Sequence, residues 1–257
     1  GARGKGDPSG SPTFERLVAA IVAGGGPRYD FAQIDPVAGA DGGEPGGNIR
    51  VGYLFDPTRV ALVRRGDGGA EDATRVATID GRPALTLSPG RIDPGCDCFE
   101  DTRKPLAAEF DFGDQKLFVI NVHLSSKGGS DPLFGAVQPP ADPRRPRRTE
   151  QARRVRALVD DVLTVDPRAA VVVLGDFNEF WFNEPMQALT GDGTLTNLIE
   201  TLDANERWTF VFQGNSQALD HVLVAGFANT EIEPVHACSG LLDAASDHDP
   251  VLVRLRP

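Results

Sequence analysis

The chain has 257 residues, of which 40% are hydrophobic and 25% charged, so it holds enough apolar material for a folded core and disorder is excluded as its default state. Its 26 basic and 37 acidic residues give a formal net charge of -11, which excludes a general electrostatic affinity for nucleic acid and restricts such contact to local patches. No apolar run approaches the roughly 20 residues of a membrane-spanning helix, and the N-terminus lacks the pattern of a signal peptide.

The first part of the chain predicts a helix and a hairpin. Residues 1–10 are rich in glycine and charge and are interpreted as a flexible segment before a single domain over residues 11–257. Ser11 and the proline after it are typical of a helix start, and apolar residues at helical spacing follow, so this helix is expected to pack on a sheet. Apolar alternation over residues 49–55 predicts a strand, with residues 60–63 as its hairpin partner.

The remainder predicts helices mixed with strands. Residues 64–100 carry many turn residues and few apolar runs, and are interpreted as a surface excursion rather than core. Residues 106–112 and 117–122 predict a second hairpin, and a helix with an apolar stripe is expected from about Thr149. Further elements are predicted as a helix at 184–189 and strands at 171–174, 209–212, 219–224 and from 251 onward. Hairpins mixed with strand–helix–strand units are typical of a mixed α/β protein.

Cysteine is rare in this chain. The three cysteines, Cys96, Cys98 and Cys238, exclude a disulfide framework and leave room for one bond and one free thiol. A C-x-C pair without a second pair is weak evidence for zinc.

Polar side chains gather where apolar strands end. Asp176 and Asn178 follow a buried strand two residues apart, so both can face one ligand while Phe177 turns into the core. Asp247 and His248 lie just before the last strand. Asp and Asn oxygens suit Mg²⁺, and a histidine supplies a titratable group. The alternative is a set of strand-end turns, which favour the same residue types.

Four strand ends carry such groups, and this recurrence favours a functional site over turns. The groups are His123; Asp176 with Asn178; Asp220; and Asp247 with His248. Their motifs resemble those of the endonuclease/exonuclease/phosphatase superfamily, in order and spacing, over nearly the whole chain. The motifs are Asn121-Val122-His123, Gly175-Asp176-Phe177-Asn178, Leu219-Asp220-His221-Val222 and Ser246-Asp247-His248-Asp249-Pro250. Stretches around Arg103, Lys127 and Gly214 look like the bacterial extracellular nuclease branch.

The resemblance implies a deoxyribonuclease-like α/β/β/α sandwich of four layers, with two mixed sheets and the site at one edge. By position, His123 would contact the scissile phosphate as a hydrogen-bond donor or acid. Asp176 would orient the attacking water or hold metal, and Asn178 would fix the phosphate. Arg103 and Asn121 would bind the substrate.

The resemblance also implies a metal centre. Asp247, with Asp176, would ligate Mg²⁺, with Mn²⁺ or Ca²⁺ as other candidates. Asp220 would orient His248, which would act as a base or as a phosphate-stabilising imidazole. The family's first strands carry an asparagine and a metal-binding glutamate, and neither is found, since Glu15 and Glu44 do not match. An N-terminally incomplete chain is therefore expected, with weakened metal binding and self-association through an uncovered sheet edge.

The implied function is a secreted, Mg²⁺-dependent phosphodiester hydrolase that cuts DNA, with RNA as a further substrate. The alternatives are a phosphomonoesterase or phospholipid phosphodiesterase of the same fold, and a catalytically inactive scaffold module. A run of arginines is either a phosphate-tracking patch or a solvated face paired with acidic neighbours, the second being slightly favoured. The run comprises Arg144, Arg145, Arg147, Arg148, Arg153, Arg154 and Arg156. Trp181 and Trp208 either stack on bases or lie in the core. His221 and His236 are expected to be structural or at the surface, with His221 the closer of the two to the site.

Overall fold

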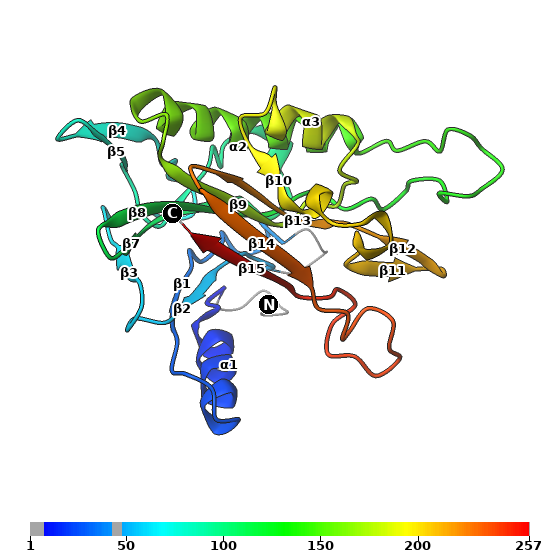
Figure 1. The fold of residues 1–257 in the computed structure, drawn as a ribbon, viewed down its shortest axis with the longest axis horizontal. Coiled ribbons are helices and arrows are strands. Elements are labelled where there is room, and N and C mark those ends of the chain that lie inside the picture. The colour runs from blue at the N-terminus through cyan, green and yellow to red at the C-terminus, as the bar shows by residue number, and fades with distance from the viewer. Residues whose placement is uncertain (1–7, 43–47, 257) are drawn as a thin grey trace.

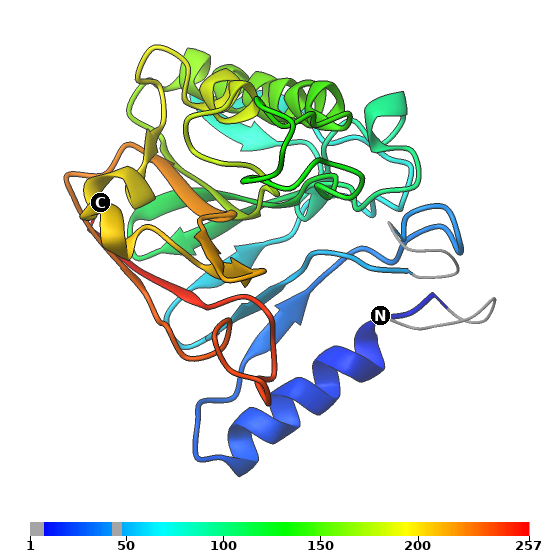
Figure 2. The ribbon, with the colours of Figure 1, turned by 90° about the vertical axis from the view of Figure 1, so that its right-hand side faces the viewer.

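The computed structural model describes residues 8–42 and 48–256, and its elements stack in four layers (Figures 1 and 2). The helices α2 (Arg145–Val165) and α3 (Glu184–Thr190) cover one face of the main sheet. Two pairs of strands cover the other face, and α1 (Ser11–Ala23) lies beyond them. The layer order is therefore α/β/β/α. The flexible segment predicted for residues 1–10 falls mostly outside the described residues, and so does Glu44.

The main sheet has seven strands and carries most of the predicted site. Its strands are β3 (Ala61–Val63), β6 (Gly90–Arg91), β7 (Leu106–Phe112), β8 (Gln115–His123), β9 (Ala170–Asp176), β10 (Thr196–Asn197) and β13 (Asp220–Ala225). They follow the order β10-β13-β9-β8-β7-β3, and β6 also pairs with β7. Only β8 and β9 are parallel, because α2 crosses between them, so the sheet is mixed. The predicted mixed α/β class is confirmed.

The second β-layer consists of two separate antiparallel pairs. They are β1 (Asp30–Ala32) with β2 (Tyr53–Phe55), and β14 (Asn229–Pro234) with β15 (Val251–Arg256). Inward side chains of β15 alternate with exposed ones along the strand, as a sheet that is solvated on one face requires. Among the described residues the second layer is thus not one continuous mixed sheet. The outer edges of β1 and β15 have no strand partner in this part of the chain, and self-association there stays a prediction.

The remaining elements are short and mostly lie at the rim of the fold. They are the hairpins β4 (Val76–Ile79) with β5 (Arg82–Leu85) and β11 (Phe210–Phe212) with β12 (Asn215–Gln217), and the 3₁₀ helices η1 (Asp97–Phe99), η2 (Leu198–Thr201) and η3 (Ala204–Glu206).

The largest core cluster lies between α2 and the main sheet. Val155, Val159 and Val162 of the helix are buried against apolar residues of β8 and β9, such as Ile120 and Val171. Each such side chain stabilises the fold by roughly 1.5–3 kcal/mol through its removal from water. This packing fixes the parallel pair β8–β9, on which the site is built.

Two expectations from the sequence were wrong. The strand at residues 60–63 does not pair with β2, because the turn at Asp56 carries the chain from the second layer into the main sheet, where β3 pairs with β7. The region 64–100 is not only a surface excursion, since Leu85 and Ile92 join the core beneath α2. The expected packing of the first helix on a sheet is found, since Phe14 of α1 stacks on Phe31 of β1 at 5.2 Å, although no residue of α1 is buried.

Cys96 and Cys98 form a disulfide that spans the start of η1, and Cys238 is a free thiol. None of the helices in the described part of the chain combines the length and apolar character that crossing a bilayer requires.

Candidate active site

Three polar side chains lie side by side at one edge of the main sheet. Asp176 of β9 has two register partners. They are His123 in the parallel pair β8–β9 and Asp220 in the antiparallel pair β13–β9. Directly paired residues point to the same face of a sheet, so the three side chains form one row. His123 Nε2 lies 3.3 Å from Asp176 Oδ2. This edge is at the right of Figure 1 and faces the viewer in Figure 2.

A glycine allows the close approach of β8 and β9 beneath this row. Gly175 has a φ of 132°, and a Cβ at this position would lie 2.0 Å from the carbonyl oxygen of Val122. Only glycine fits both conditions without displacing the backbone. The residue before Asp176 is thus fixed by packing as well as by the family motif.

His248 approaches the row from the second layer. Its Nδ1 lies 2.6 Å from Asp220 Oδ2, and its Nε2 lies 4.0 Å from Asp176 Oδ2. Thr209 donates its hydroxyl to the same oxygen of Asp220 at 2.7 Å. The ring of Phe210 packs against the imidazole, with 4.7 Å between ring centroids. The orientation of His248 by Asp220, predicted from the resemblance, has the contact that it requires.

The loop that carries Asp247 and His248 is anchored by Asp249. Its buried carboxylate accepts hydrogen bonds from three successive backbone amides, those of residues 237–239, and from the hydroxyl of Ser239. The backbone amide of Asp249 in turn donates to the carbonyl of Thr209 at 2.7 Å. The His248 loop is therefore tied to the segment that also holds Asp220.

Asn178 and Arg103 converge on one carbonyl group. Asn178 has a left-handed φ of 51°, and its side-chain amide donates to the Leu124 carbonyl at 3.2 Å and to Asp176 Oδ2 at 3.1 Å. Arg103 donates from Nη2 to the same carbonyl at 2.8 Å. The guanidinium is buried, and its Nε has no partner within the described residues. A buried, charged donor of this kind is suited to an anion.

The pKa values of the titratable groups in the site differ widely from their ordinary values. Burial, with the charges of Arg103 and His248, lowers the pKa of His123 to about 3. Burial, with the charge of Asp220, raises the pKa of Asp176 to about 6. Burial alone would lower the pKa of His248, but the hydrogen bond and charge of Asp220 and the charge of Asp176 raise it to about 9. At neutral pH, His123 is therefore a neutral imidazole and His248 an imidazolium.

A group of metal-ligating side chains coincides with the row. Asp176, Asp220 and His248 each offer one ligand atom, and these atoms lie within 4.8 Å of one another. The two carboxylate oxygens fit a divalent cation that prefers oxygen ligands, whereas the imidazole of His248 would be a ligand only in its neutral form. Asp247, which the resemblance assigns to the metal, is exposed and lies outside this group of three.

The other candidate residues have mainly structural contacts. Asn121 donates to the carbonyl of Gly52 and so ties β8 to the second layer. His221 is buried, with its Nε2 2.9 Å from the carbonyl oxygen of Glu179. His236 stacks on Trp208 at 3.6 Å between centroids.

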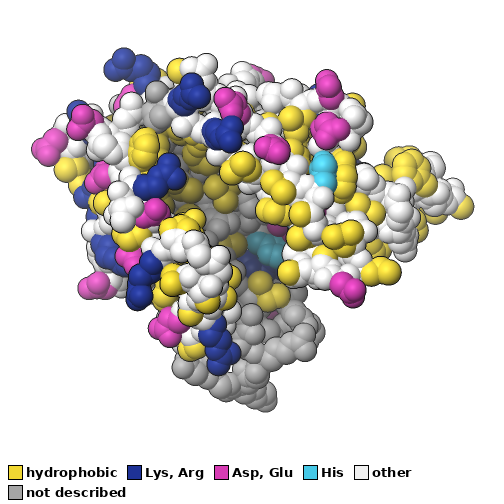
Figure 3. Space-filling view, turned by 60° about the horizontal axis from the view of Figure 1, so that its bottom comes forward, with side chains coloured by type: hydrophobic (Ala, Val, Ile, Leu, Met, Phe, Trp, Pro, Cys, Tyr) yellow, Lys and Arg dark blue, Asp and Glu magenta, His cyan; other side chains and the backbone are white. Residues whose placement is uncertain are grey.

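The arginine run is largely paired within the protein, and it does not form a free basic patch. Arg153, Arg154 and Arg156 bind acidic side chains on the exposed face of α2, as the second interpretation expects. Arg147 donates to backbone carbonyls near η1. Arg148 fits neither interpretation, because it is fully buried. Figure 3 views the molecule from the side of the second β-layer, opposite α2, and shows histidine side chains among hydrophobic ones.

Comparisons with known proteins agree with this geometry. The sequence matches the model of the Endonuclease/Exonuclease/phosphatase family over residues 12–248. A search of curated proteins found no match.

Among solved structures, truncated Caenorhabditis elegans TDP2 is similar with a TM-score of 0.55 and 15% identity, over 95% of this chain and 81% of that one. D. rerio TDP2 complexed with single-strand DNA product gives a TM-score of 0.53 and 16% identity, over 93% and 80%. The Bacteroides thetaiotaomicron mannosyl-6-phosphatase Bt3783 gives 0.50 and 14%, over 98% and 97%. At these identities, the likeness shows the fold alone.

Proposed function

Because this chain belongs to the endonuclease/exonuclease/phosphatase family, whose enzymes are generally hydrolytic and typically use a divalent metal, we propose that it is a Mg²⁺-dependent phosphodiesterase that cuts nucleic acid, DNA above all. The observation that carries the proposal is the convergence of Arg103, Asn178 and the row of His123, Asp176 and Asp220 at one sheet edge. These groups combine buried hydrogen-bond donors for a phosphate with carboxylates that can hold a cation or a water.

Each residue has a role that its surroundings support. Arg103 would donate to the non-bridging oxygens of the phosphate through the guanidinium donors that the Leu124 carbonyl leaves unused. Asn178 would donate to the phosphate by releasing one of its two amide hydrogen bonds, to Leu124 or to Asp176. His123, neutral at pH 7, would donate a hydrogen bond rather than a proton. Asp176 would accept a proton from the attacking water, because a pKa of about 6 leaves it mostly ionised yet basic enough.

His248 would stabilise negative charge and protonate the leaving oxygen. As an imidazolium held by Asp220, it presents Nε2 toward the site at 4.0 Å from Asp176 Oδ2. Of the two roles that the resemblance offers for His248, the phosphate-stabilising one therefore agrees better with its charge. A divalent cation held by the carboxylates of Asp176 and Asp220, with Asp247 nearby, would neutralise charge that develops on the phosphate oxygens, while the protonated His248 would not be a ligand.

Nucleic acid is the proposed substrate because one structural neighbour is described with a single-strand DNA product. A secreted location belongs to the same proposal, and the Cys96–Cys98 disulfide supports it, since disulfides persist mainly in oxidising compartments.

The test is nicking of supercoiled plasmid DNA with Mg²⁺, and with Mg²⁺ plus chelator. The wild type is expected to nick the plasmid, and chelator is expected to abolish this activity. His248→Ala is expected to lower it by at least about 100-fold. Asp243→Ala, at an exposed carboxylate in the same loop, is the control and should nick like the wild type. Nicking that survives chelator, or that His248→Ala leaves unchanged, contradicts the proposal.

A phosphomonoesterase is the second candidate, favoured by the similarity to a mannosyl-6-phosphatase over 98% of this chain. Release of inorganic phosphate from mannose 6-phosphate, without plasmid nicking, would establish it in place of the first.

A further inference from the structure

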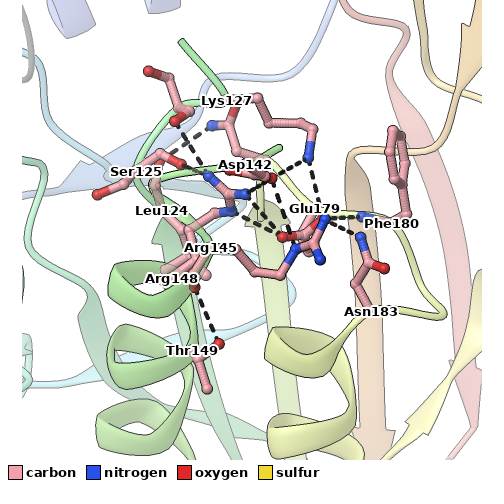
Figure 4. A network of polar contacts seen from close by, with 12 residues as sticks. Leu124, Ser125, Lys127, Asp142, Arg145, Arg148, Thr149, Glu179, Phe180 and Asn183 are labelled. Carbon is pink, nitrogen blue, oxygen red and sulfur yellow. Dashed lines mark hydrogen bonds and ion pairs between the residues drawn. The ribbon is translucent and has the colours of Figure 1, made fainter. Parts of the chain in front are cut away.

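A buried ion pair lies between the loops that carry Leu124 and Asn178. Arg148, in the first turn of α2, and Glu179, which follows Asn178, are both fully buried. Arg148 donates from Nε and Nη2 to Glu179 Oε2, at 3.0 and 2.9 Å (Figure 4). The charges of Arg148 and Lys127 outweigh burial and lower the pKa of Glu179, so the carboxyl group is ionised.

The Glu179 end of the pair organises the turn after β9. Its Oε1 accepts from the backbone amide of Phe180 at 3.1 Å and from the side-chain amide of Asn183 at 2.7 Å. The carbonyl of Glu179 lies within hydrogen-bond distance of His221 Nε2 on β13. The turn that begins with the left-handed Asn178 is thus held through both the side chain and the backbone of the next residue.

The Arg148 end organises the loop after β8. Its Nη1 donates to the carbonyls of Ser125 and Ser126, at 3.3 and 3.2 Å, and its Nη2 also binds Asp142. Ser125 directly follows Leu124, whose carbonyl accepts from both Arg103 and Asn178. The guanidinium of Arg148 therefore connects the loop after β8 with the turn after β9. These two segments carry the Leu124 carbonyl and Asn178, which contact each other in the site.

We propose that Arg148 and Glu179 are positioning residues, and that their ion pair sets the mutual placement of Asn178 and the Leu124 carbonyl on which phosphate binding depends. The proposal rests on the proposed function of the same site. A buried ion pair is weak evidence for a role in stability, because apolar residues of similar volume often replace one without loss. Apolar residues cannot replace its hydrogen bonds to the backbones of the two loops, and this difference separates positioning from simple packing.

The test is the double variant Arg148→Met/Glu179→Leu, which removes both charges and keeps the volume. Inorganic phosphate binding, measured by isothermal titration calorimetry without metal, is expected to weaken about tenfold, and kcat on bis(4-nitrophenyl) phosphate with Mg²⁺ to fall about 100-fold. The thermal unfolding midpoint is expected to stay near that of the wild type. Arg148→Lys keeps the charge without the planar fork, so it is expected to fold and to show a smaller loss of both quantities.

The chain offers a matched control. Arg153 and Glu184 form an exposed ion pair at 3.3 Å that also joins α2 to the segment after β9. Arg153→Met/Glu184→Leu makes the same chemical change at the surface and should leave phosphate affinity and kcat unchanged.

The outcomes separate the two proposals. Wild-type phosphate affinity and kcat in the folded double variant, or in Arg148→Lys if the double variant does not fold, would overturn the positioning role while leaving the function intact. A wild type that binds phosphate but hydrolyses no phosphodiester refutes the proposed function, and the phosphate titrations then still decide the positioning role. In a wild type that hydrolyses the phosphodiester but binds no free phosphate, the kcat of the double variant alone decides the positioning role.

Discussion

His248 and Asp220 share a hydrogen bond of 2.6 Å between Nδ1 and Oδ2, although one comes from the loop before β15 and the other from the start of β13. Asp220→Asn removes the charge that raises the pKa of His248, and that pKa is therefore expected to fall from about 9 toward the ordinary value near 6.5. The activity should drop about 100-fold at pH 8, where the imidazole would then be neutral. Nuclear magnetic resonance titration of the imidazole and a pH–rate profile measure the two effects. An unshifted His248 titration would contradict this reading, and Asp243→Asn serves as the control.

Arg103 is expected to bind phosphate through its fork of donors. Arg103→Lys keeps a positive charge but replaces the planar fork with a single ammonium nitrogen, which cannot reproduce the spread of donors toward the Leu124 carbonyl and a phosphate. Phosphate affinity should fall at least about tenfold, as measured by calorimetry. Arg154→Lys, at a half-exposed arginine on α2, should change nothing. A phosphate affinity of Arg103→Lys equal to that of the wild type would show that Arg103 does not bind phosphate.

Gly175 is expected to tolerate no side chain. The Cβ of alanine would lie 2.0 Å from the Val122 carbonyl oxygen, so Gly175→Ala must push β8 and β9 apart, at a cost of about 3 kcal/mol or more. Urea unfolding measures this loss. Gly113→Ala is the matched control, because that glycine also has a positive φ but no atom within 4 Å of its Cβ position, and it should cost about 1 kcal/mol. Similar losses in the two variants would show that conformation rather than contact dominates.

Asp249 should make stability depend on pH in the acid range. Burial alone would raise its pKa, but hydrogen bonds from Ser239 and Cys238 lower it to about 2. A depressed pKa contributes stability above the unfolded value of about 3.9, and this contribution is lost as the pH falls toward 2. Asp249→Asn should therefore cost about 2 kcal/mol at pH 7 and much less near pH 2. Denaturant unfolding at several pH values measures the gap, and a gap that is constant with pH would assign the cost to shape instead of charge.

Asp247 offers a test of the metal assignment. Its carboxylate is exposed beside His248, so Asp247→Asn is expected to raise the Mg²⁺ concentration for half-maximal activity about tenfold and to change the saturated rate less. A metal titration of the reaction measures both quantities. An unchanged titration would leave the carboxylates of Asp176 and Asp220 as the protein ligands within the described part of the chain.

The site motifs could be found in the sequence because each is local. An apolar strand that ends in Asp, Asn or His carries its own signature, and the order of these motifs gave the resemblance to the family, which the family match confirms. Which strands are neighbours is not local. Adjacency in the sequence predicts that residues 60–63 pair with the strand at 49–55. The observed pairing with β7 depends on residues that are distant in the sequence.

The sequence did not predict the Arg148–Glu179 ion pair, although the position of Arg148 in the helix indicated burial. Arg148 lies four residues before Ala152, on the same helical stripe as Val155 and Val159, so its spacing predicted a buried position. Its neighbours in an arginine-rich run led to a surface interpretation instead. Glu179 showed no pattern of its own, because its burial depends on a partner from another element.

The row formed by His123, Asp176 and Asp220 limits how sequence length can vary in this molecule. An insertion of one residue within β9 reverses every later side chain, and Asp176 would then face the opposite side of the sheet. The middle of the loop, at residues 128–141, and the turn of the β11–β12 hairpin lie beyond the paired positions and beyond the contacts of Arg148, so segments of different length can be grafted there without resetting the row. Substrate preference can therefore diverge by loop exchange while the chemical groups stay in place.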